Sequence, residues 1–367
     1  MTNETVNQNT VTAAADTVAS ALDTARLGGT DMEITRVGFG SWAVSGGGWT
    51  YSWGATDDAE SVAAMRHAVE SGVNWIDTAA YYGLGHSEEL VGKAISGFSD
   101  ADRPYVFTKV GLVGDPADPQ RPPVRTMKPA SVRREVEDSL RRLGVERIDL
   151  YQVHWPDTGE AFVYGEETDG PASPDHTPLE EYWQVMADLK AEGKVRAIAL
   201  SNHGPRLMAA AEPIAHVEAI QPPFSAINRS AAEDIAWARE HGAGVIVYSP
   251  LQSGLLTGTF SAERAANLAA GDWRRTAPDF TSGLAANLRL ADALRPVAAR
   301  HGVGVAEVAI AWTLAWPGVT GAIVGARTPA QVDGWLKAGA VRLAARDLAE
   351  IAEAIRTTGA GVGPAQA

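Results

Sequence analysis

The residues of this chain that could do acid–base chemistry fall at the ends of short apolar runs. Asp77 ends the run VNWID, Lys109 lies in YVFTKV, His154 ends IDLYQVH, and Tyr82 follows Asp77 by five residues. A phenol has a pKa near 10, and a neighbouring ammonium stabilises its phenolate and lowers that pKa. Asp77 can hold the lysine in place, and His154 can donate a hydrogen bond to a carbonyl oxygen. Such a set can polarise a carbonyl group and deliver a proton to it.

Each of these residues taken alone also has a purely structural interpretation. Asp77 and Lys109 could form an ion pair inside a barrel, and His154 could be a core histidine with its hydrogen bonds satisfied. Tyr81, next to Tyr82, is interpreted as a packing residue that faces another way. The residues alone leave these alternatives open. The sequence contains neither H-x-H nor H-E-x-x-H, so it predicts no metal site.

Eight short apolar runs alternate with helical segments and must position these groups. Strands that alternate with helices pair in parallel through right-handed crossovers, and eight such units predict a closed barrel. An open doubly wound sheet is the alternative, but its G-x-G-x-x-G turn is absent. The runs lie at 36–42, 73–77, 105–110, 148–154, 196–202, 217–224, 244–250 and 321–327, and helices are expected at about 56–72, 129–143, 177–193, 230–241 and 329–338.

The predicted fold is therefore α/β, a (β/α)8 TIM barrel with an N-terminal β-hairpin and extended loops after strands four and seven. Residues 1–24 have little to bury and are expected to be a disordered or loosely attached leader. Residues 25–367 are expected to form a single barrel domain that begins with the hairpin. The long loops, 157–177 and 251–284, fall on the face where barrel active sites lie. The acidic 157–177 insertion is read as a lid, a subunit contact or a solvated loop.

Composition excludes several kinds of partner and chemistry. The 367 residues include 31 basic and 45 acidic ones, a net charge of −14, so we expect neither nucleic acid nor a membrane surface as a partner. Cysteine is absent, and no signal peptide or long apolar segment is present, so we expect a cytoplasmic protein; the oligomeric state stays open. Of the 11 tryptophans, Trp75, Trp312 and Trp316 are expected in the core, whereas Trp42, Trp49, Trp53, Trp155 and Trp273 lie in loops and either line a pocket or cap the core.

Six motifs in order resemble the aldo-keto reductase superfamily, in particular bacterial NADP-dependent members. They are GVNWIDTAAYYG, FTKVG, LYQVHWPD, RAIALSNHG, VYSPLQSGLLTG and IVGARTPAQV, and the resemblance runs from about Ala25 to about Gly363. Members are barrel enzymes that move hydride between a nicotinamide cofactor and a carbonyl. The family places its catalytic tyrosine five residues after the aspartate, so the resemblance implies Tyr82 as the acid–base residue and Asp77, Lys109 and His154 as its partners.

The resemblance also implies the cofactor site. Ser201, Asn202 and Gln221 would bind the carboxamide, Tyr248 would stack on the nicotinamide ring, and the segment from Ser249 would wrap the pyrophosphate. The full implied set is Gly40, Ser41, Trp42, Asp77, Ser201, Asn202, Gln221, Tyr248, Ser249, Pro250, Leu251, Ser253, Gly254, Leu255, Gly325, Arg327 and Gln331. The implied substrate pocket consists of Trp42, Trp53, Tyr82, His154 and Trp155.

Two departures from the family bear on the choice of cofactor. Gly325 stands where many members carry a lysine that contacts the 2′-phosphate, and Trp335 stands where an asparagine usually meets the adenine. NADP(H) is favoured because Arg327 can pair with a phosphate bidentately, and NAD(H) stays open as the alternative.

The leading interpretation is a reversible NADPH-dependent reduction of an aldehyde or ketone, with sugars and ring ketones among the candidates, since the sequence does not name the substrate. The alternative is a nicotinamide-binding regulatory subunit that acts through a protein partner, and turnover of generic aldehydes would separate the two. A metal-dependent barrel hydrolase lacks the ligands it would need.

Overall fold

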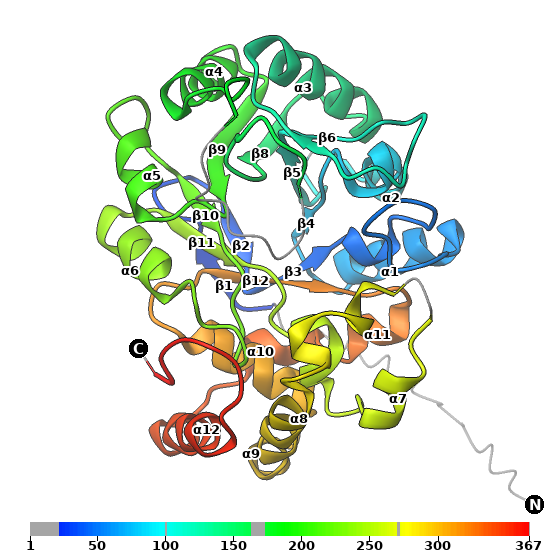
Figure 1. The fold of residues 1–367 in the computed structure, drawn as a ribbon, viewed down its shortest axis with the longest axis vertical. Helices are drawn as coiled ribbons and strands as arrows, with labels where there is room; N and C mark the ends of the chain where they lie inside the picture. Colours follow the sequence, from blue (N-terminus) through cyan, green and yellow to red (C-terminus); the bar gives the residue numbers. More distant parts are fainter. Residues whose placement is uncertain (1–21, 100, 163–172, 270–271, 367) are drawn as a thin grey trace, which may run out of the picture.

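A closed barrel of eight parallel strands forms the centre of the computed structural model, which describes residues 22–99, 101–162, 173–269 and 272–366 (Figure 1). The order around the barrel is the order along the chain, as in a (β/α)8 fold, so the predicted architecture is confirmed. The strands are β3 (Val37–Gly40), β4 (Trp75–Asp77), β5 (Tyr105–Val110), β8 (Ile148–Val153), β9 (Val195–Ser201), β10 (Ala219–Gln221), β11 (Gly244–Val247) and β12 (Gly321–Gly325).

The N-terminal hairpin closes one end of this barrel. Its strands β1 (Thr24–Arg26) and β2 (Glu33–Thr35) pair antiparallel. Leu27 and Met32 of the hairpin join one buried cluster with inward-facing strand residues such as Trp75. The barrel interior is therefore filled with side chains, and a Cβ at Gly38 would lie 2.1 Å from the Trp75 ring.

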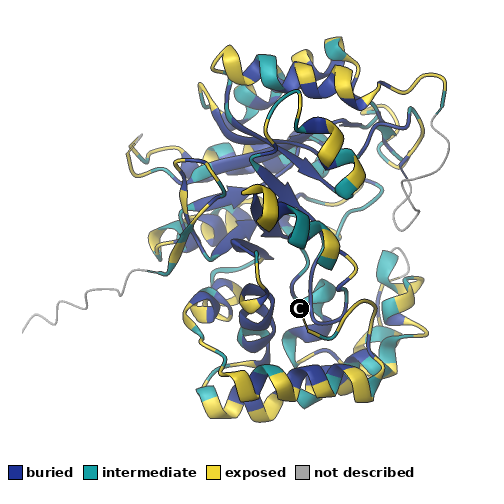
Figure 2. Ribbon diagram, turned by 90° about the vertical axis from the view of Figure 1, so that its left-hand side faces the viewer, coloured by how far each residue is buried: buried dark blue, intermediate teal, exposed yellow. Residues whose placement is uncertain are grey.

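Helices surround the barrel, with buried residues toward the strands and exposed residues outward (Figure 2). Asp57 caps the first of them, because its carboxylate accepts a 2.8 Å hydrogen bond from the Glu60 N–H. The helices are α1 (Asp58–Glu70), α2 (His86–Ile95), α3 (Pro129–Leu143), α4 (Leu179–Ala191), α5 (Pro205–Ala211), α6 (Ala232–His241), α8 (Leu284–Ala293), α9 (Arg295–His301), α10 (Val305–Ala315), α11 (Pro329–Asp333) and α12 (Ala345–Thr358). No helix in the described ranges is both long and apolar enough to cross a membrane.

The connections differ from the sequence-based expectation in two places. The loop after β5 contains an unexpected antiparallel pair, β6 (Leu112–Val113) with β7 (Val124–Arg125). The segment after β11 is not a plain loop. It contains four short helices, whose turns satisfy the backbone N–H and C=O groups locally. They are η3 (Gln252–Thr257), α7 (Ala262–Ala266), η4 (Trp273–Arg275) and η5 (Pro278–Phe280).

The expected leader and acidic insertion fall largely outside the described residues. Thr24 is already part of β1, so the folded chain begins earlier than residue 25, because the β1 strand pairs with β2 from that residue. Residues 1–21 of the leader and residues 163–172 of the insertion after β8 are not described. The expectations about a disordered leader and an acidic lid therefore stay predictions.

Candidate active site

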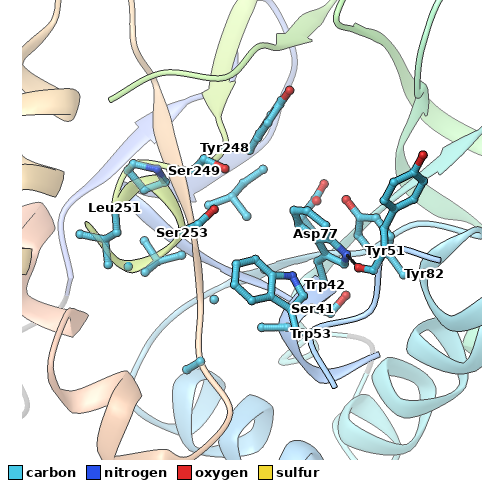
Figure 3. A pocket seen from close by; sticks show the side chains of 18 of the residues that line it. Ser41, Trp42, Tyr51, Trp53, Asp77, Tyr82, Tyr248, Ser249, Leu251 and Ser253 are labelled. Atoms are coloured by element: carbon cyan, nitrogen blue, oxygen red, sulfur yellow. Dashed lines mark hydrogen bonds between the residues drawn. The ribbon is translucent and has the colours of Figure 1, made fainter. Parts of the chain in front are cut away.

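The carboxyl ends of the barrel strands open into a cavity of about 650 Å³. Figure 3 shows Tyr248, Ser249 and Ser253 on one side of it and Asp77 with Tyr82 on the other. Every residue that the sequence assigned to the cofactor or the substrate lines this cavity except Leu255. Leu255 is fully buried in the hydrophobic core, so its side chain is a packing residue of η3.

Four side chains that could take part in acid–base chemistry meet at the carboxyl ends of the strands β4, β5 and β8. Asp77 ends β4, Lys109 lies near the end of β5, and His154 follows β8. The Lys109 ammonium donates to a carboxylate oxygen of Asp77, to the Thr78 carbonyl at 2.8 Å and to the Tyr82 hydroxyl at 3.5 Å. The rings of Tyr82 and His154 meet edge to face, with centroids 5.7 Å apart.

The two adjacent tyrosines have different surroundings. Tyr82 begins the 3₁₀ helix η2 (Tyr82–Gly85), and the Lys109 ammonium lies 5.0 Å from its ring centroid. Tyr81 instead packs its ring edge to face on Trp49, with centroids 5.2 Å apart, and belongs to an aromatic cluster. The geometry thus separates a tyrosine in contact with the ion pair from one that serves as a wall.

Burial is the largest single influence on the pKa values of Tyr82, Lys109 and His154. It raises the pKa of Tyr82, with Asp77 acting in the same direction and Lys109 in the opposite one. The expected lowering of this pKa by the ammonium is therefore wrong in net direction, because desolvation of the phenolate outweighs it. Burial also lowers the ammonium's pKa at Lys109, but the Asp77 carboxylate reverses that shift and the net change is upward. Burial and the Lys109 charge hold the pKa of His154 well below its usual range, so its imidazole is neutral.

The second oxygen of Asp77 is held by two amides. Gln152 and Gln221 donate to it at 3.0 and 2.8 Å, and Gln221 also donates to the Gln152 amide oxygen at 2.8 Å. The side-chain nitrogen of Gln221 is thus hydrogen-bonded to Asp77 and Gln152. Gln152 was missed by sequence reasoning. The signal was available, since Gln152 is a polar residue two positions before His154 on the inward-facing side of β8.

A connected set of polar side chains lies at the ends of β9 and β11. The Tyr248 hydroxyl donates to the Asn202 amide oxygen at 2.8 Å, and the Asn202 amide nitrogen donates to the His154 carbonyl at 2.9 Å. The Ser201 hydroxyl donates to the Gln221 carbonyl at 2.8 Å. The residues predicted to meet a nicotinamide are thereby fixed relative to His154.

The chain after Tyr248 adopts an unusual backbone around the cavity. Ser249, Gln252 and Ser253 have φ of 58°, 44° and 53°, in the left-handed region that side chains larger than glycine rarely adopt. Gly254 follows them with a φ of 102°, and the N–H groups of Gln252 and Gly254 donate to the carbonyls of Ser249 and Leu251 at 2.9 and 3.1 Å. These turns carry Ser249, Ser253 and Gly254 along the wall of the cavity.

Three arginines line the same cavity, two of them unforeseen. Arg327 was predicted, and its guanidinium donates to the carbonyls of Ala43 and Trp53. Arg264 and Arg274 come from the long segment after β11, and the Arg274 guanidinium lies 5.0 Å from the Trp53 ring centroid. Asp77 is the one carboxylate among the described lining residues, and it is paired with a lysine. Gln331 accepts a 2.7 Å hydrogen bond from the Arg327 N–H and so positions that residue.

The profile of the Aldo/keto reductase family matches residues 36–356. The chain belongs to this family. It is 35% identical to the aldo-keto reductase YhdN of Bacillus subtilis over 308 residues, which cover 83% of this chain and 85% of the relative. It is 30% identical to the NADH-specific methylglyoxal reductase of Escherichia coli over 341 residues, which cover 90% and 98% of the two chains.

Solved structures agree with the family assignment. The glycerol dehydrogenase AKR11B4 from Gluconobacter oxydans superposes with a TM-score of 0.79 at 34% identity, covering 93% of this chain and 98% of that one. Similarity to proteins named for different substrates shows the reaction class but not the substrate.

The part of the cavity around Tyr82 is distinctly aromatic in this aldo/keto reductase. Residues of this wall pack in one cluster, which consists of Trp42, Trp49, Tyr51, Tyr81, Tyr82, Leu84, Leu112, Trp155 and Phe162. Several of its polar atoms are engaged by backbone carbonyls. Trp42 Nε1 donates to Tyr51 at 3.1 Å, Trp49 Nε1 to Gly46 at 3.2 Å, and the Tyr51 hydroxyl to Phe162 at 3.0 Å. Of the loop tryptophans, Trp42, Trp49, Trp53 and Trp155 line the pocket, whereas Trp273 packs behind Trp42 and Trp53. Trp75, Trp312 and Trp316 lie in the core as predicted.

Proposed function

We propose that this aldo/keto reductase reduces an aldehyde or ketone to the alcohol with NADPH, reversibly, with Tyr82 as the general acid. The observation that carries the proposal is the contact of the Tyr82 hydroxyl with the buried Lys109–Asp77 pair, in the cavity that the left-handed loop and three arginines also line. Bound NADPH would supply the hydride for the carbonyl carbon.

The residues of the chain divide the remaining work. A phenol is protonated at neutral pH, which is the form that a proton donor needs, and burial raises the pKa of Tyr82 further. Once the proton has moved to the carbonyl oxygen, the Lys109 ammonium stabilises the phenolate that remains. The neutral imidazole of His154 keeps one N–H, which can hold the carbonyl oxygen near Tyr82. Asp77 keeps the ammonium charged and in place.

The cofactor site fits a phosphorylated dinucleotide. Ser249 and Ser253 present left-handed backbone to the cavity, and Arg327, Arg274 and Arg264 supply cationic groups that suit phosphate. NADP(H) is preferred over NAD(H) because guanidinium groups recognise a 2′-phosphate far better than a 2′-hydroxyl. The similar Escherichia coli protein is named as NADH-specific, so this preference is part of the proposal.

The substrate is inferred to be a neutral carbonyl compound with a flat or ring-shaped substituent. Indole and phenol rings surround Tyr82, and the nitrogens of Trp42 and Trp49 are already bonded to the backbone. Such a wall stabilises apolar surface and leaves few partners for the hydroxyls of a small polyol. We expect benzaldehyde to exceed glyceraldehyde in kcat/KM by at least about tenfold. The opposite order would contradict this assignment.

Tyr82→Phe tests the reaction, and Tyr81→Phe is its matched control. Loss of a general acid lowers kcat by about 10²–10⁴-fold, whereas the remaining ring keeps NADPH affinity within about twofold. Tyr81→Phe should keep kcat within a few-fold, because its ring packs on Trp49. The measurements are steady-state turnover of an aldehyde and a fluorescence titration with NADPH. Full activity in Tyr82→Phe would refute the assignment, and absence of any aldehyde turnover in the wild type would favour a regulatory role.

A further inference from the structure

Arg229 is a buried arginine outside the cavity that fastens the C-terminal segment to the body of the protein. Its side chain donates to the carbonyls of Ala360 at 3.2 Å, Gly363 at 3.1 Å and Pro364 at 2.9 Å. Its backbone N–H donates to the Val362 carbonyl at 3.0 Å. Burial lowers the pKa of Arg229, and no carboxylate among the described residues counters this shift. The hydrogen-bond partners of the Arg229 guanidinium among the described residues are thus backbone carbonyl groups.

The C-terminal segment, defined as residues 359–364, follows α12 and returns to the turn before α6 (Figure 1). Val362 pairs with Asn228 of this turn, and the Val362 N–H donates to the Ile227 carbonyl at 3.0 Å. Gly361 passes so close that a Cβ on it would lie 1.6 Å from the Ile227 oxygen. The contact therefore requires glycine at this position.

The same turn is bonded to the cofactor loop, defined as residues 249–254. The Ser225 hydroxyl, which is fully buried, accepts from the Asn228 N–H at 2.9 Å and donates to the Gln252 amide oxygen at 2.9 Å. The Gln252 amide nitrogen in turn donates to Asp279 of η5 at 2.7 Å. The side chain of Gln252 is thus held from both sides.

Gln252 lies in the part of the cofactor loop where the backbone is strained. It and its neighbours Ser249 and Ser253 have positive φ, a conformation that persists only where surrounding contacts enforce it. Ser249 and Ser253 line the cavity, whereas Ser225, Arg229 and Gln252 do not. The enforcing contacts therefore reach the loop from outside the site.

We propose that the C-terminal segment braces the cofactor loop through Arg229, Ser225 and Gln252, and that part of the affinity for NADPH depends on this brace. The proposal rests on the proposed function, because it assumes that NADPH occupies the cavity. Arg229 and Ser225 are positioning residues in this scheme, since neither can touch the cofactor or the substrate.

A pair of glycines offers a matched test. Gly361 and Gly359 have nearly equal φ, 66° and 65°, so alanine is equally strained at both, but a Cβ at Gly359 meets nothing within 4 Å. Gly361→Ala should therefore dislodge the segment and raise the Kd for NADPH by about three- to tenfold, the effect of one net hydrogen bond. Gly359→Ala should leave this Kd within about twofold. The kcat at saturating NADPH should stay within about twofold in both variants.

Ser225→Ala and Arg229→Met complete the test in the full-length protein. Each should raise the NADPH Kd by a similar factor, and the double variant should add little to either one, because both residues act through the same path. Arg229→Lys should restore part of the affinity. Wild-type affinity in Gly361→Ala and Ser225→Ala, or equal losses in both glycine variants, would overturn the brace while leaving the proposed function intact. If the wild type does not bind NADPH at all, the proposed function fails instead.

If Arg229→Met does not fold, Ser225→Ala and the glycine pair still decide the question. A kcat that falls as much as the affinity in these variants would also overturn the proposal, because it would place the effect on the reacting groups rather than on cofactor binding.

Discussion

Replacing Arg327 by alanine should separate the two roles that the structure gives this residue. Its guanidinium lines the cavity and also donates to the carbonyls of Ala43 and Trp53. The carbonyl bonds hold the loop that carries Trp42 and Trp53, so losing them affects NADPH and NADH alike. A contact with a 2′-phosphate would affect NADPH alone.

The expected magnitudes follow from these two kinds of contact. A charge-assisted hydrogen bond contributes about 1.5–3 kcal/mol, which is roughly a 10- to 100-fold change in Kd. The shared loss of loop order should weaken both cofactors by about the same several-fold factor. The ratio of the two dissociation constants cancels the shared part. Arg327→Ala should therefore raise the Kd for NADPH, relative to the Kd for NADH, by about 10- to 100-fold.

Fluorescence titration of the wild type and the variants with each cofactor measures this ratio. Arg327→Lys keeps the charge but loses the planar fork, so its ratio should fall between the other two. Arg26→Ala is a control for general electrostatics, because Arg26 is a well-exposed arginine, with a side chain that is 65% accessible, on the N-terminal hairpin. Equal weakening for the two cofactors by Arg327→Ala would refute the phosphate contact and leave Arg327 as a loop-positioning residue only.

Two further predictions concern buried charge. Lys109→Met should lower kcat by at least about 100-fold, because the phenolate of Tyr82 loses its counter-charge, whereas Asp77→Asn should cost less since the ammonium remains; negligible losses in both would reduce the pair to a structural role. Burial raises the pKa of Glu135 to about 7. The folded state then binds more protons than the unfolded state above pH 4.5, so this group's contribution to stability is full at low pH and is lost as pH rises through 7. Compared with Glu135→Gln, the wild type should lose about 2–3 kcal/mol of unfolding free energy between pH 5 and 8 in denaturant titrations, and parallel pH profiles would contradict this.

The barrel and the four central residues were predictable because their signals are local. An apolar run of strand length repeats eight times, and the chemically active residue of each run lies at its carboxyl end, where the strands of a barrel converge. The spacing alone does not distinguish Tyr82 from its neighbour Tyr81, and the choice of Tyr82 came from the resemblance to the family. The structure places the Tyr82 hydroxyl 3.5 Å from the Lys109 ammonium, whereas Tyr81 packs on Trp49.

The residues that sequence reasoning missed are placed by tertiary contacts. Arg274 lies in a segment with no regular period. Its ion pair with Asp272, its hydrogen bond to the Ser253 carbonyl and its packing on Trp53 bring it to the cavity. Leu255 was misplaced for the converse reason, because a 3₁₀ turn rotates its side chain into the core while its neighbour Gly254 lines the site. The net direction of the Tyr82 pKa also could not be foreseen, since it depends on burial as much as on the neighbouring charge.

The whole chain is negatively charged, whereas the residues that line the cavity include three arginines and one aspartate. An anionic cofactor would therefore meet opposite charges at long and at short range. The net charge of −14 repels a dinucleotide at long range, but ions screen exposed charges beyond about 8 Å at physiological salt. Arg264, Arg274 and Arg327 line the cavity, and Asp77 is the one carboxylate among the described lining residues. Arg274 is also paired with Asp272 at 2.6 Å, so Arg264 and Arg327 are the cations of the lining without an ion pair among the described residues. Affinity for a phosphate must therefore arise from these short-range contacts and from the shape of the loop at Ser249. Such affinity depends on how firmly the loop is held, which is why residues outside the cavity can tune it.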